Sequence, residues 1–353
     1  MGDIRSRKAD HLELAATADV GFRRKTNLFE CVELIHNALP ELDFDSLDTS
    51  VTVLGKRLRA PLCIAGMTGG TERAANINAE LSALAEECGY AFGLGSQRAM
   101  MKKTELAKTF QVRAGAPNTL ILGNIGAVQA RDCGTPELEE LVGQIGADAL
   151  CVHLNPAMEL VQSDGDRDFR GIEETFRRLT NELSVPVVAK ETGCGLSRSV
   201  AQRLVASGVR HVDVSGAGGT SWVAVETHRA EPGRRPLGER FWDWGVPTAA
   251  SVAVTAKHFR TVFATGGMSD GLEAAKAIAL GATVVGMARP VLIAFEEGGR
   301  SGARTFFQQV ELELKMAMLL VGAANLSQLM SAPRVMSDPL RQWLSAQGIR
   351  GDA

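Results

Sequence analysis

The sequence predicts an α/β protein built as one (β/α)8 TIM barrel with an N-terminal extension. Eight short apolar segments recur along the chain, and helical segments fill the intervals between them. The apolar segments show little alternation, as parallel strands covered on both faces do. Eight such strands alternating with helices favour a closed barrel over an open sheet. The predicted strands are 60–67, 90–96, 118–127, 148–155, 185–193, 211–218, 262–268 and 283–290.

The predicted helices carry apolar residues at helical spacing. They are 72–88, 171–183, 197–206, 247–258 and 270–280, with a long closing helix over 304–329. The connection 217–246 is unusually long, and connections of that kind often form lids or substrate loops.

The chain of 353 residues suffices for one large barrel or two ordinary domains. Neither a low-complexity linker nor a second core is recognisable, so we expect a single domain over 1–353. Residues 1–59 form the predicted extension, with a helix near 29–37 and an extended pair around 42–58.

Composition excludes several classes of protein. The net charge of −3 argues against nucleic acid as the main partner, although a compact basic cluster could still bind a small anion. No apolar run reaches the ~18–20 residues of a membrane span. The first residues lack the apolar stretch of a signal peptide, so we expect a cytoplasmic protein. The six cysteines form no CxxC pair and are predicted to be buried reduced thiols.

The active site of such a barrel lies at the C-terminal ends of its strands. Glycine-rich or polar turns follow the predicted strands there, among them GMTGGT (66–71), SGAGGTSW (215–222) and GGMSDG (266–271). Turns after the last two strands form the usual phosphate site, and glycine lets backbone N–H groups approach phosphate closely. The residues that fit this role are Gly266, Gly267, Ala288 and Arg289.

Lys190 ends the fifth predicted strand. A buried lysine is costly without an anionic partner, and the N1–C2=O edge of a reduced flavin is one such partner. A lysine snorkelling out of the barrel mouth and a Schiff-base lysine are the alternatives that the sequence leaves open.

A second group of candidates points to a diphosphate. Arg7, Lys8 and His11 form a compact cationic group, which is either solvated surface or, with Arg98 and His153, a diphosphate site. Glu159 follows the fourth predicted strand. Magnesium on a diphosphate needs only one or two protein carboxylates, so Glu159 is a candidate ligand or a simple salt-bridge partner.

Taken together and in order, these segments resemble the type 2 isopentenyl diphosphate isomerases over nearly the whole chain. The combination is far more specific than any single motif. The segments that carry the resemblance are RKADH, AGMTGG, GSQR, NIGA, HLNP with its following Glu, VQSDGDRDF (161–169), KETG, DVSGAGGTSW and the pair Val225 and Glu226.

The resemblance implies reduced FMN, kept reduced by NADPH, and Mg²⁺ on a prenyl diphosphate, in a homo-oligomer that is a tetramer or larger. The implied net reaction moves a proton across an allylic system, converting isopentenyl to dimethylallyl diphosphate. The implied FMN contacts are Met67, Thr68, Gly69, Ser96, Asn124, Lys190, Ser215, Thr220, Gly266, Gly267, Met268, Ala288 and Arg289. The implied substrate contacts are Arg7, Lys8, His11, Ser96, Gln97, Arg98, Asn155 and Met158; the metal ligand is Glu159, and the catalytic positions are Glu226, Met158 and His153.

Two positions depart from the family pattern. Met158 replaces a Gln at the substrate's carbon chain, and a thioether is a weak acceptor that cannot relay a proton, although it can line an apolar pocket. Either Glu226 and the flavin cover this role, or the chemistry has diverged. Ser269 stands where the family more often has Arg.

Two other functions compete with the isomerase. One is a flavin oxidoreductase acting on a hydroxy acid or a prenyl substrate. Hydroxy-acid oxidases of this fold need a histidine base near strand 6 or 7, and the turns SGAGGTSW and ATGGMSDG contain none. The other is a non-catalytic prenyl diphosphate or flavin sensor, in which Met158 has disabled turnover.

Overall fold

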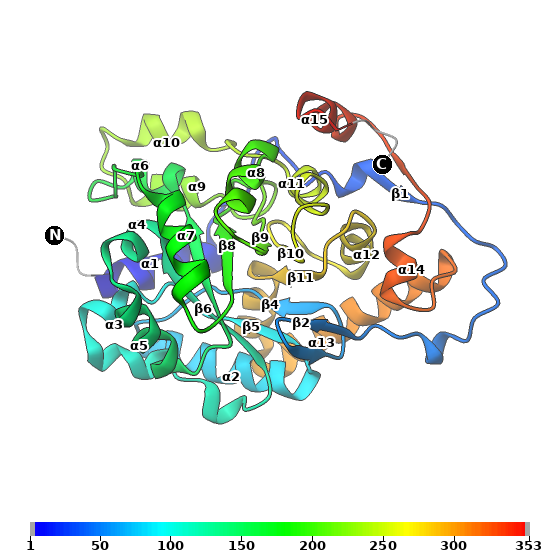
Figure 1. Ribbon diagram of the computed structural model, residues 1–353, viewed down its shortest axis with the longest axis horizontal. Helices are drawn as coiled ribbons and strands as arrows, with labels where there is room; N and C mark the ends of the chain where they lie inside the picture. Colours follow the sequence, from blue (N-terminus) through cyan, green and yellow to red (C-terminus); the bar gives the residue numbers. More distant parts are fainter. Residues whose placement is uncertain (1–3, 350–353) are drawn as a thin grey trace.

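A closed barrel of eight parallel strands lies at the centre of the computed structural model, which describes residues 4–349 and side chains from Asp10 onward (Figure 1). The strands neighbour one another in the order β10-β11-β4-β5-β6-β7-β8-β9. All eight predicted strands are confirmed, and each is shorter than its apolar segment because the segment ends become turns. They are β4 (Leu62–Ile64), β5 (Ala91–Gly93), β6 (Leu120–Gly126), β7 (Ala149–Leu154), β8 (Val187–Glu191), β9 (His211–Asp213), β10 (Thr261–Ala264) and β11 (Val284–Met287).

The helices between the strands confirm the predicted alternation. α2 begins and ends where the sequence predicts, because Thr71 caps it by accepting from the N–H of Ala74 and Gly89 ends it in the left-handed conformation. The outer helices are α2 (Glu72–Cys88), α4 (Ala127–Asp132), α5 (Thr135–Ile145), α7 (Ile172–Glu182), α8 (Arg198–Ala206), α11 (Thr248–Thr255), α12 (Gly271–Ala279) and α13 (Arg289–Leu320).

The predicted closing helix is confirmed with different limits. It begins at Arg289, directly after the last barrel strand, and has a kink at Gly299. A separate α14 (Leu326–Met330) covers the rest of the predicted range. The elements that sequence reasoning missed include α3 (Arg98–Lys102), α5, α6 (Pro156–Val161), α15 (Leu340–Ala346) and two short 3-10 helices, η3 (Thr104–Thr109) and η4 (Arg113–Gly115).

The predicted helix near 29–37 is wrong. Only a 3-10 turn, η1 (Phe29–Cys31), forms there, and β1 (Val32–Leu34) then pairs antiparallel with β12 (Arg334–Met336). The partner strand lies at the other end of the chain, and long-range pairing overrides a short local pattern. The predicted extended pair is confirmed as a hairpin of β2 (Val51–Val53) and β3 (Lys56–Leu58), after the 3-10 turn η2 (Phe44–Ser46).

The hairpin packs against the interior of the barrel. Val53 and Leu58 share an apolar cluster with inward-facing strand residues such as Cys63, Leu122 and Phe263. Burying this cluster fills the end of the barrel away from the site and leaves the C-terminal ends of the strands open. All six cysteines are free thiols; four are buried as predicted, whereas Cys133 and Cys194 are only partly buried.

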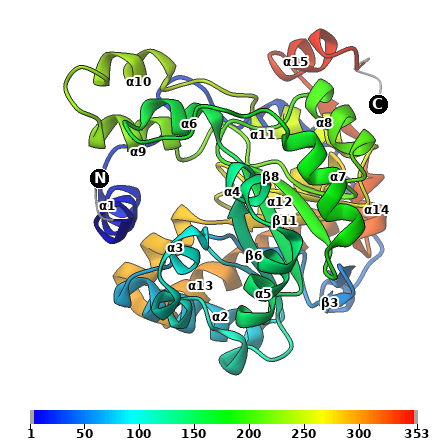
Figure 2. The ribbon, with the colours of Figure 1, turned by 60° about the vertical axis from the view of Figure 1, so that its left-hand side comes forward.

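The long connection 217–246 contains two helices, α9 (Trp222–Arg229) and α10 (Arg235–Phe241). The N-terminal helix α1 (Ile4–Thr17) lies between α9 and α13 (Figure 2). Within residues 4–349, no helix combines the length and the apolar character needed to cross a membrane.

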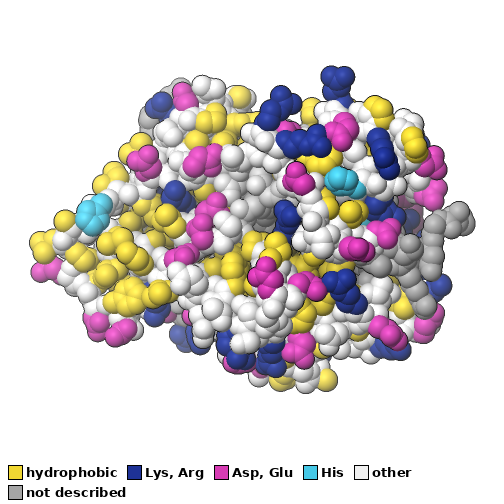
Figure 3. Space-filling model, turned by 180° about the vertical axis from the view of Figure 1, so that it is seen from behind, with side chains coloured by type: hydrophobic (Ala, Val, Ile, Leu, Met, Phe, Trp, Pro, Cys, Tyr) yellow, Lys and Arg dark blue, Asp and Glu magenta, His cyan; other side chains and the backbone are white. Residues whose placement is uncertain are grey.

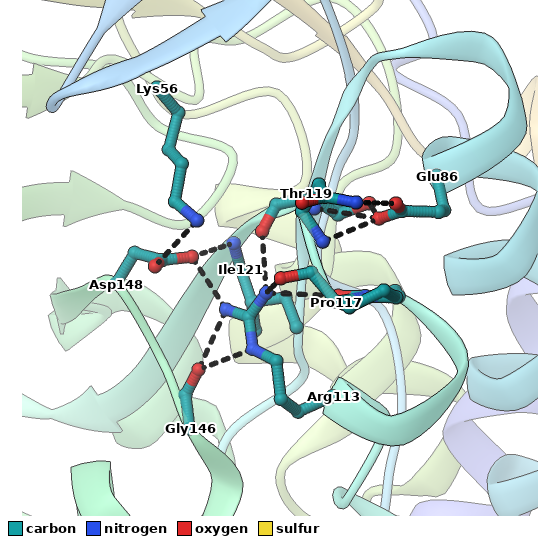
Figure 4. Close-up of polar contacts among 10 residues, drawn as sticks. Lys56, Glu86, Arg113, Pro117, Thr119, Ile121, Gly146 and Asp148 are labelled. Carbon is teal, nitrogen blue, oxygen red and sulfur yellow. Dashed lines mark hydrogen bonds and ion pairs between the residues drawn. The ribbon is translucent and has the colours of Figure 1, made fainter.

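Arg113 joins several loops at the N-terminal end of the barrel (Figure 4). Its guanidinium donates to the carbonyl oxygens of Thr119 and Gly146 and to Asp148 Oδ2, at 2.9, 2.7 and 2.6 Å. Asp148 also accepts from the N–H of Ile121 at 2.8 Å and lies 3.4 Å from Lys56 Nζ. Arg113 and Asp148 together therefore connect the starts of β6 and β7, and Lys56 of the hairpin joins them through Asp148.

Arg113→Ala is expected to lower the free energy of unfolding by about 3 kcal/mol, because it leaves partly buried carbonyls and a carboxylate without their charged donor. Urea denaturation followed by circular dichroism measures the change. Arg57→Ala, at an exposed site on β3, is the matched control and should cost less than about 0.5 kcal/mol. Equal losses in the two variants would contradict the assigned role of Arg113.

Candidate active site

A cavity of about 800 Å³ opens at the C-terminal ends of the barrel strands. Its wall brings together residues from α1, from all eight strand ends and from α6. The predicted site residues on this wall are His11, Met67, Thr68, Ser96, Arg98, Asn124, His153, Asn155, Met158, Glu159, Lys190, Ser215, Thr220, Gly266, Gly267, Met268, Ala288 and Arg289.

Three predicted site residues lie off the wall. A Cβ on Gly69 would fall 1.9 Å from the ring of Phe110, so packing explains this glycine. Gln97 is fully buried, and its Oε1 accepts from the N–H of Asn124 at 2.8 Å. Glu226 is buried behind His11. The side chains of Arg7 and Lys8 lie outside the described residues.

Strand register places the central polar side chains at one level. His153 on β7 is paired with Lys190 on β8, which is paired in turn with Asp213 on β9. The Lys190 Nζ atom lies 2.5 Å from Asp213 Oδ2, and Asp213 Oδ1 accepts from Thr265 Oγ1 at 2.5 Å. The site therefore contains a hydrogen-bonded ion pair, in which Lys190 lines the cavity and Asp213 does not.

The anionic partner of Lys190 within the protein is Asp213, which sequence reasoning missed. The ammonium does not snorkel, since the Lys190 side chain is only 12% exposed. Although burial acts in the opposite direction, the charge and hydrogen bond of Asp213 raise the pKa of Lys190. A raised pKa keeps the amine protonated and disfavours the Schiff-base alternative.

Asn124 orients His153. The Asn124 Nδ2 group donates to the carbonyl of Leu94, so its Oδ1 accepts from His153 Nδ1 at 2.8 Å. This contact assigns the proton to Nδ1 and leaves Nε2 as the ring atom that accepts or, when protonated, donates. His153 can thus serve as a donor to an anion in the cavity.

Glu159 sits at the start of α6 and is 6% exposed. Its Oε1 accepts from Asn155 Nδ2 at 2.9 Å and its Oε2 from the N–H of Asp166 at 2.8 Å. Met158 lies beside it, with its Sδ 3.9 Å from Asn155 Nδ2. Among residues 4–349, no three His, Cys, Asp or Glu side chains gather into a metal cage, so a metal here needs ligands from a bound molecule.

The N-terminal helix is tied to the site by polar contacts. His11 Nε2 lies 2.6 Å from Glu226 Oε1, and Glu226 Oε2 accepts from Arg229 at 2.8 Å. The guanidinium of Arg289 donates to the carbonyl oxygens of Ala15 and Ala18 at 2.9 and 3.0 Å. Arg289 therefore lies on the wall but also holds the end of α1, a contact that the sequence did not reveal.

The Gly266–Gly267 turn has a packing reason that sequence reasoning did not include. Both residues have positive φ, at 101° and 76°. A Cβ on Gly266 would lie 2.2 Å from the carbonyl oxygen of Gly216. The two glycines are thus required by the close approach of the loops after β9 and β10, whether or not a phosphate binds there. Ser269, which stands where the related sequences more often have Arg, donates its Oγ–H to Glu273 Oε2 at 2.9 Å. This turn is therefore held by a hydrogen bond to a carboxylate.

Glu191 shapes the turn after β8. Its Oε2 accepts from the N–H groups of Thr192, Cys194 and Gly195 at 2.6, 2.5 and 3.0 Å. Burial nevertheless raises the pKa of Glu191 to about 8, against the opposing effect of these hydrogen bonds and of Lys190. The folded protein therefore retains a proton that the unfolded chain releases near pH ~4.3.

This proton gives a pH dependence with a definite sign. Between about pH 5 and 8 the native state binds the extra proton, so the free energy of unfolding falls as pH rises, by up to ~1.4 kcal/mol per pH unit. Glu191→Gln should remove this slope, whereas Glu231→Gln, at an exposed site, should keep it. Urea denaturation from pH 5 to 8 measures the three profiles, and parallel profiles for wild type and Glu191→Gln would refute the assignment.

The family model described as FMN-dependent dehydrogenase matches residues 3–135 and 149–335, and so gives the class of this barrel. A Synechococcus sp. isopentenyl-diphosphate delta-isomerase is 49% identical over 82% of this chain and 85% of its own length. A Nostoc sp. isopentenyl-diphosphate delta-isomerase is 44% identical over 92% and 93%. Within the class of FMN-dependent dehydrogenases, the chain belongs to the isopentenyl-diphosphate delta-isomerase family.

Solved structures agree with the fold. A putative lactate oxidase of Pediococcus acidilactici superimposes with a TM-score of 0.68, covering 95% of this chain and 93% of that one, at 14% identity. At this identity the likeness establishes the barrel architecture alone.

Proposed function

We propose that the chain catalyses the FMN- and Mg²⁺-dependent isomerisation of isopentenyl diphosphate to dimethylallyl diphosphate in isoprenoid biosynthesis. The observation that carries the proposal is that residues suited to a flavin, a diphosphate and a metal line the wall of one cavity. In a chain 44% and 49% identical to isomerases, that wall contains a lysine, a histidine, an arginine and a carboxylate, namely Lys190, His153, Arg98 and Glu159.

The residues present suit FMN. Lys190 contributes a buried positive charge, and Thr192 Oγ1 on the same wall is buried without a hydrogen-bond partner among the described residues. An orphaned hydroxyl at a cavity wall is readily explained by a bound polar group. Met67, Asn124 and Ser215 would contact the cofactor from neighbouring strands. Reduced FMN, maintained by NADPH, would supply the proton-transfer chemistry without net electron transfer.

The residues present also suit a magnesium diphosphate. Arg98 offers a forked set of donors and His153 a single N–H, both suited to phosphate oxygens. Glu159 supplies one carboxylate whose two oxygens each already accept one hydrogen bond. One protein carboxylate is enough for Mg²⁺, because the ion takes its remaining ligands from phosphate and water. His11, held by Glu226, would complete the site from α1.

Proton transfer at carbon requires a dry pocket and correctly held partners. α1 supplies part of the wall through His11, Leu12 and Ala15. In this proposal Glu226 acts by holding His11, since its carboxylate contacts His11 and Arg229 rather than the cavity. Met158 lines the prenyl end as an apolar side chain.

We also propose a homo-oligomer, a tetramer or larger, in the cytoplasm. Exposed apolar side chains occur on α13, at Leu312 and Met316. Others occur in the N-terminal extension, at Ile35 and Leu39. Figure 3 shows hydrophobic side chains gathered at the end of the molecule where α14 lies in Figure 1. Patches of this kind commonly mark protein interfaces. Sedimentation velocity measures the assembly, and a monomer would contradict the proposal.

An oxidoreductase remains the second candidate, since the superimposed lactate oxidase shares the barrel. The loops after β9 and β10 place Ser215, Thr220 and Ser269 on the wall, whereas the histidines on the wall are His11 and His153, from α1 and β7. That arrangement favours the isomerase over a hydroxy-acid oxidase with its base on strand 6 or 7.

The experiment that separates these functions is an anaerobic assay of flavin-loaded protein with NADPH, Mg²⁺ and isopentenyl diphosphate. We expect dimethylallyl diphosphate in large excess over the NADPH consumed. Stoichiometric NADPH consumption would favour the oxidoreductase. Tight binding without product would favour a sensor.

A further inference from the structure

The loop 162–171 links α6 to α7 and lies against the candidate metal ligand. A Cβ on Gly165 would fall 1.8 Å from the carbonyl oxygen of Glu159, so only glycine lets the loop approach α6 this closely. The next residue, Asp166, donates its backbone N–H to Glu159 Oε2 at 2.8 Å. The close approach therefore places a second acidic residue beside Glu159.

The Asp166 carboxylate contacts the other half of the site. Its Oδ2 lies 3.5 Å from Nη1 of Arg98 and accepts from Gln129 Nε2 at 2.6 Å. Arg98 and Gln129 both line the cavity. The side chains of Arg98 and Asp166 are 21% and 24% exposed, so their interaction is only partly screened by water.

The charges at this corner of the cavity have a chemical consequence. Among the described side chains, Asp166 and Glu159 place two carboxylates here; Arg98 lies 3.5 Å from Asp166, and Arg131 also interacts with the Asp166 charge. A metal-free diphosphate entering here would be repelled by both carboxylates and would compete with Asp166 for Arg98. A diphosphate that carries Mg²⁺ brings the cation that these carboxylates attract.

We propose that Asp166 is a specificity-determining residue that makes the site select magnesium diphosphate over metal-free diphosphate. Its backbone N–H holds one carboxylate oxygen of Glu159, the residue that would bind the metal, and its carboxylate holds Arg98 until a metal-bound diphosphate arrives. This inference rests on the proposed function, because it takes the diphosphate and Mg²⁺ to bind at Arg98 and Glu159. It assigns no step of the reaction to Asp166.

The test is calorimetric titration of inorganic pyrophosphate into flavin-loaded protein, with and without Mg²⁺. Asp166→Asn keeps the backbone N–H and the size of the side chain and removes the charge. We expect it to tighten metal-free pyrophosphate binding about 10-fold and to reduce the gain in affinity from Mg²⁺ by a similar factor. Asp166→Glu, which keeps the charge, should retain most of the Mg²⁺ gain.

Asp164→Asn is the matched control, because it makes the same change of charge at an exposed position in the same loop. It should behave like the wild type. A loop with a merely structural role would give equal Mg²⁺ gains in Asp166→Asn and Asp164→Asn, and that result would overturn the inference while leaving the proposed function intact. If the wild type binds no magnesium pyrophosphate, the proposed function fails and the inference fails with it.

Discussion

Lys190→Met is expected to lower kcat by about 10³-fold, because it removes a buried cation on the wall of the cavity. Preorganised charge of this kind has effects of that order. Lys190 is held by Asp213 at 2.5 Å and is kept protonated by it. Methionine retains most of the side-chain volume but cannot balance negative charge on the reduced cofactor. Steady-state kinetics under anaerobic conditions, with the flavin content of each preparation determined by absorbance, measures the loss.

The substitution also leaves Asp213 buried without its counter-ion, which costs about 3–5 kcal/mol of stability. The double variant Lys190→Met/Asp213→Asn separates the two effects, since Asn can still accept from Thr265 Oγ1, as Asp213 does. We expect it to recover much of the stability and none of the activity. A folded, flavin-loaded Lys190→Met protein with kcat within about 10-fold of wild type would contradict the role of Lys190.

Met158→Gln is expected to raise kcat by about 10- to 100-fold, because proton transfer by a positioned polar group contributes effects of this size. Met158 lines the cavity next to Glu159 and Asn155, where an amide can hydrogen-bond and a thioether barely can. Initial rates of dimethylallyl diphosphate formation measure the gain.

Met158→Leu is the control for the apolar part of the side chain. If Met158 only lines the prenyl pocket, the leucine variant should keep kcat within about twofold, as volume-conserving apolar changes usually do. A large loss in Met158→Leu would show that the thioether itself contributes to turnover. No gain in Met158→Gln would show that another group already supplies the missing polar function.

The barrel was predictable because its signals are local. Each strand is a short apolar run, and helices such as α2 carry their own cap residues, Thr71 and Gly89. The β1–β12 pair was not predictable, because each strand has only three residues and the partner lies at the other end of the chain. Local pattern cannot reveal such pairing.

Sequence motifs pointed to residues that the structure brings to one cavity wall, but not to the contacts between them. Motif order named candidates such as Lys190, His153 and Glu159, and these line the same cavity. The partner of Lys190 was missed, although Asp213 stands at the corresponding end of the next strand, where parallel register could have indicated it. The position of Glu226 behind His11 depends on how α1 docks on α9, which sequence spacing does not encode.

Isomerisation in D₂O tests the central claim most directly. Flavin-loaded protein incubated anaerobically with NADPH, Mg²⁺ and isopentenyl diphosphate, followed by proton and deuterium NMR, should give dimethylallyl diphosphate with deuterium in the newly formed methyl group. Recovery of unlabelled, unchanged isopentenyl diphosphate from protein that has bound flavin and substrate would contradict the proposed isomerase.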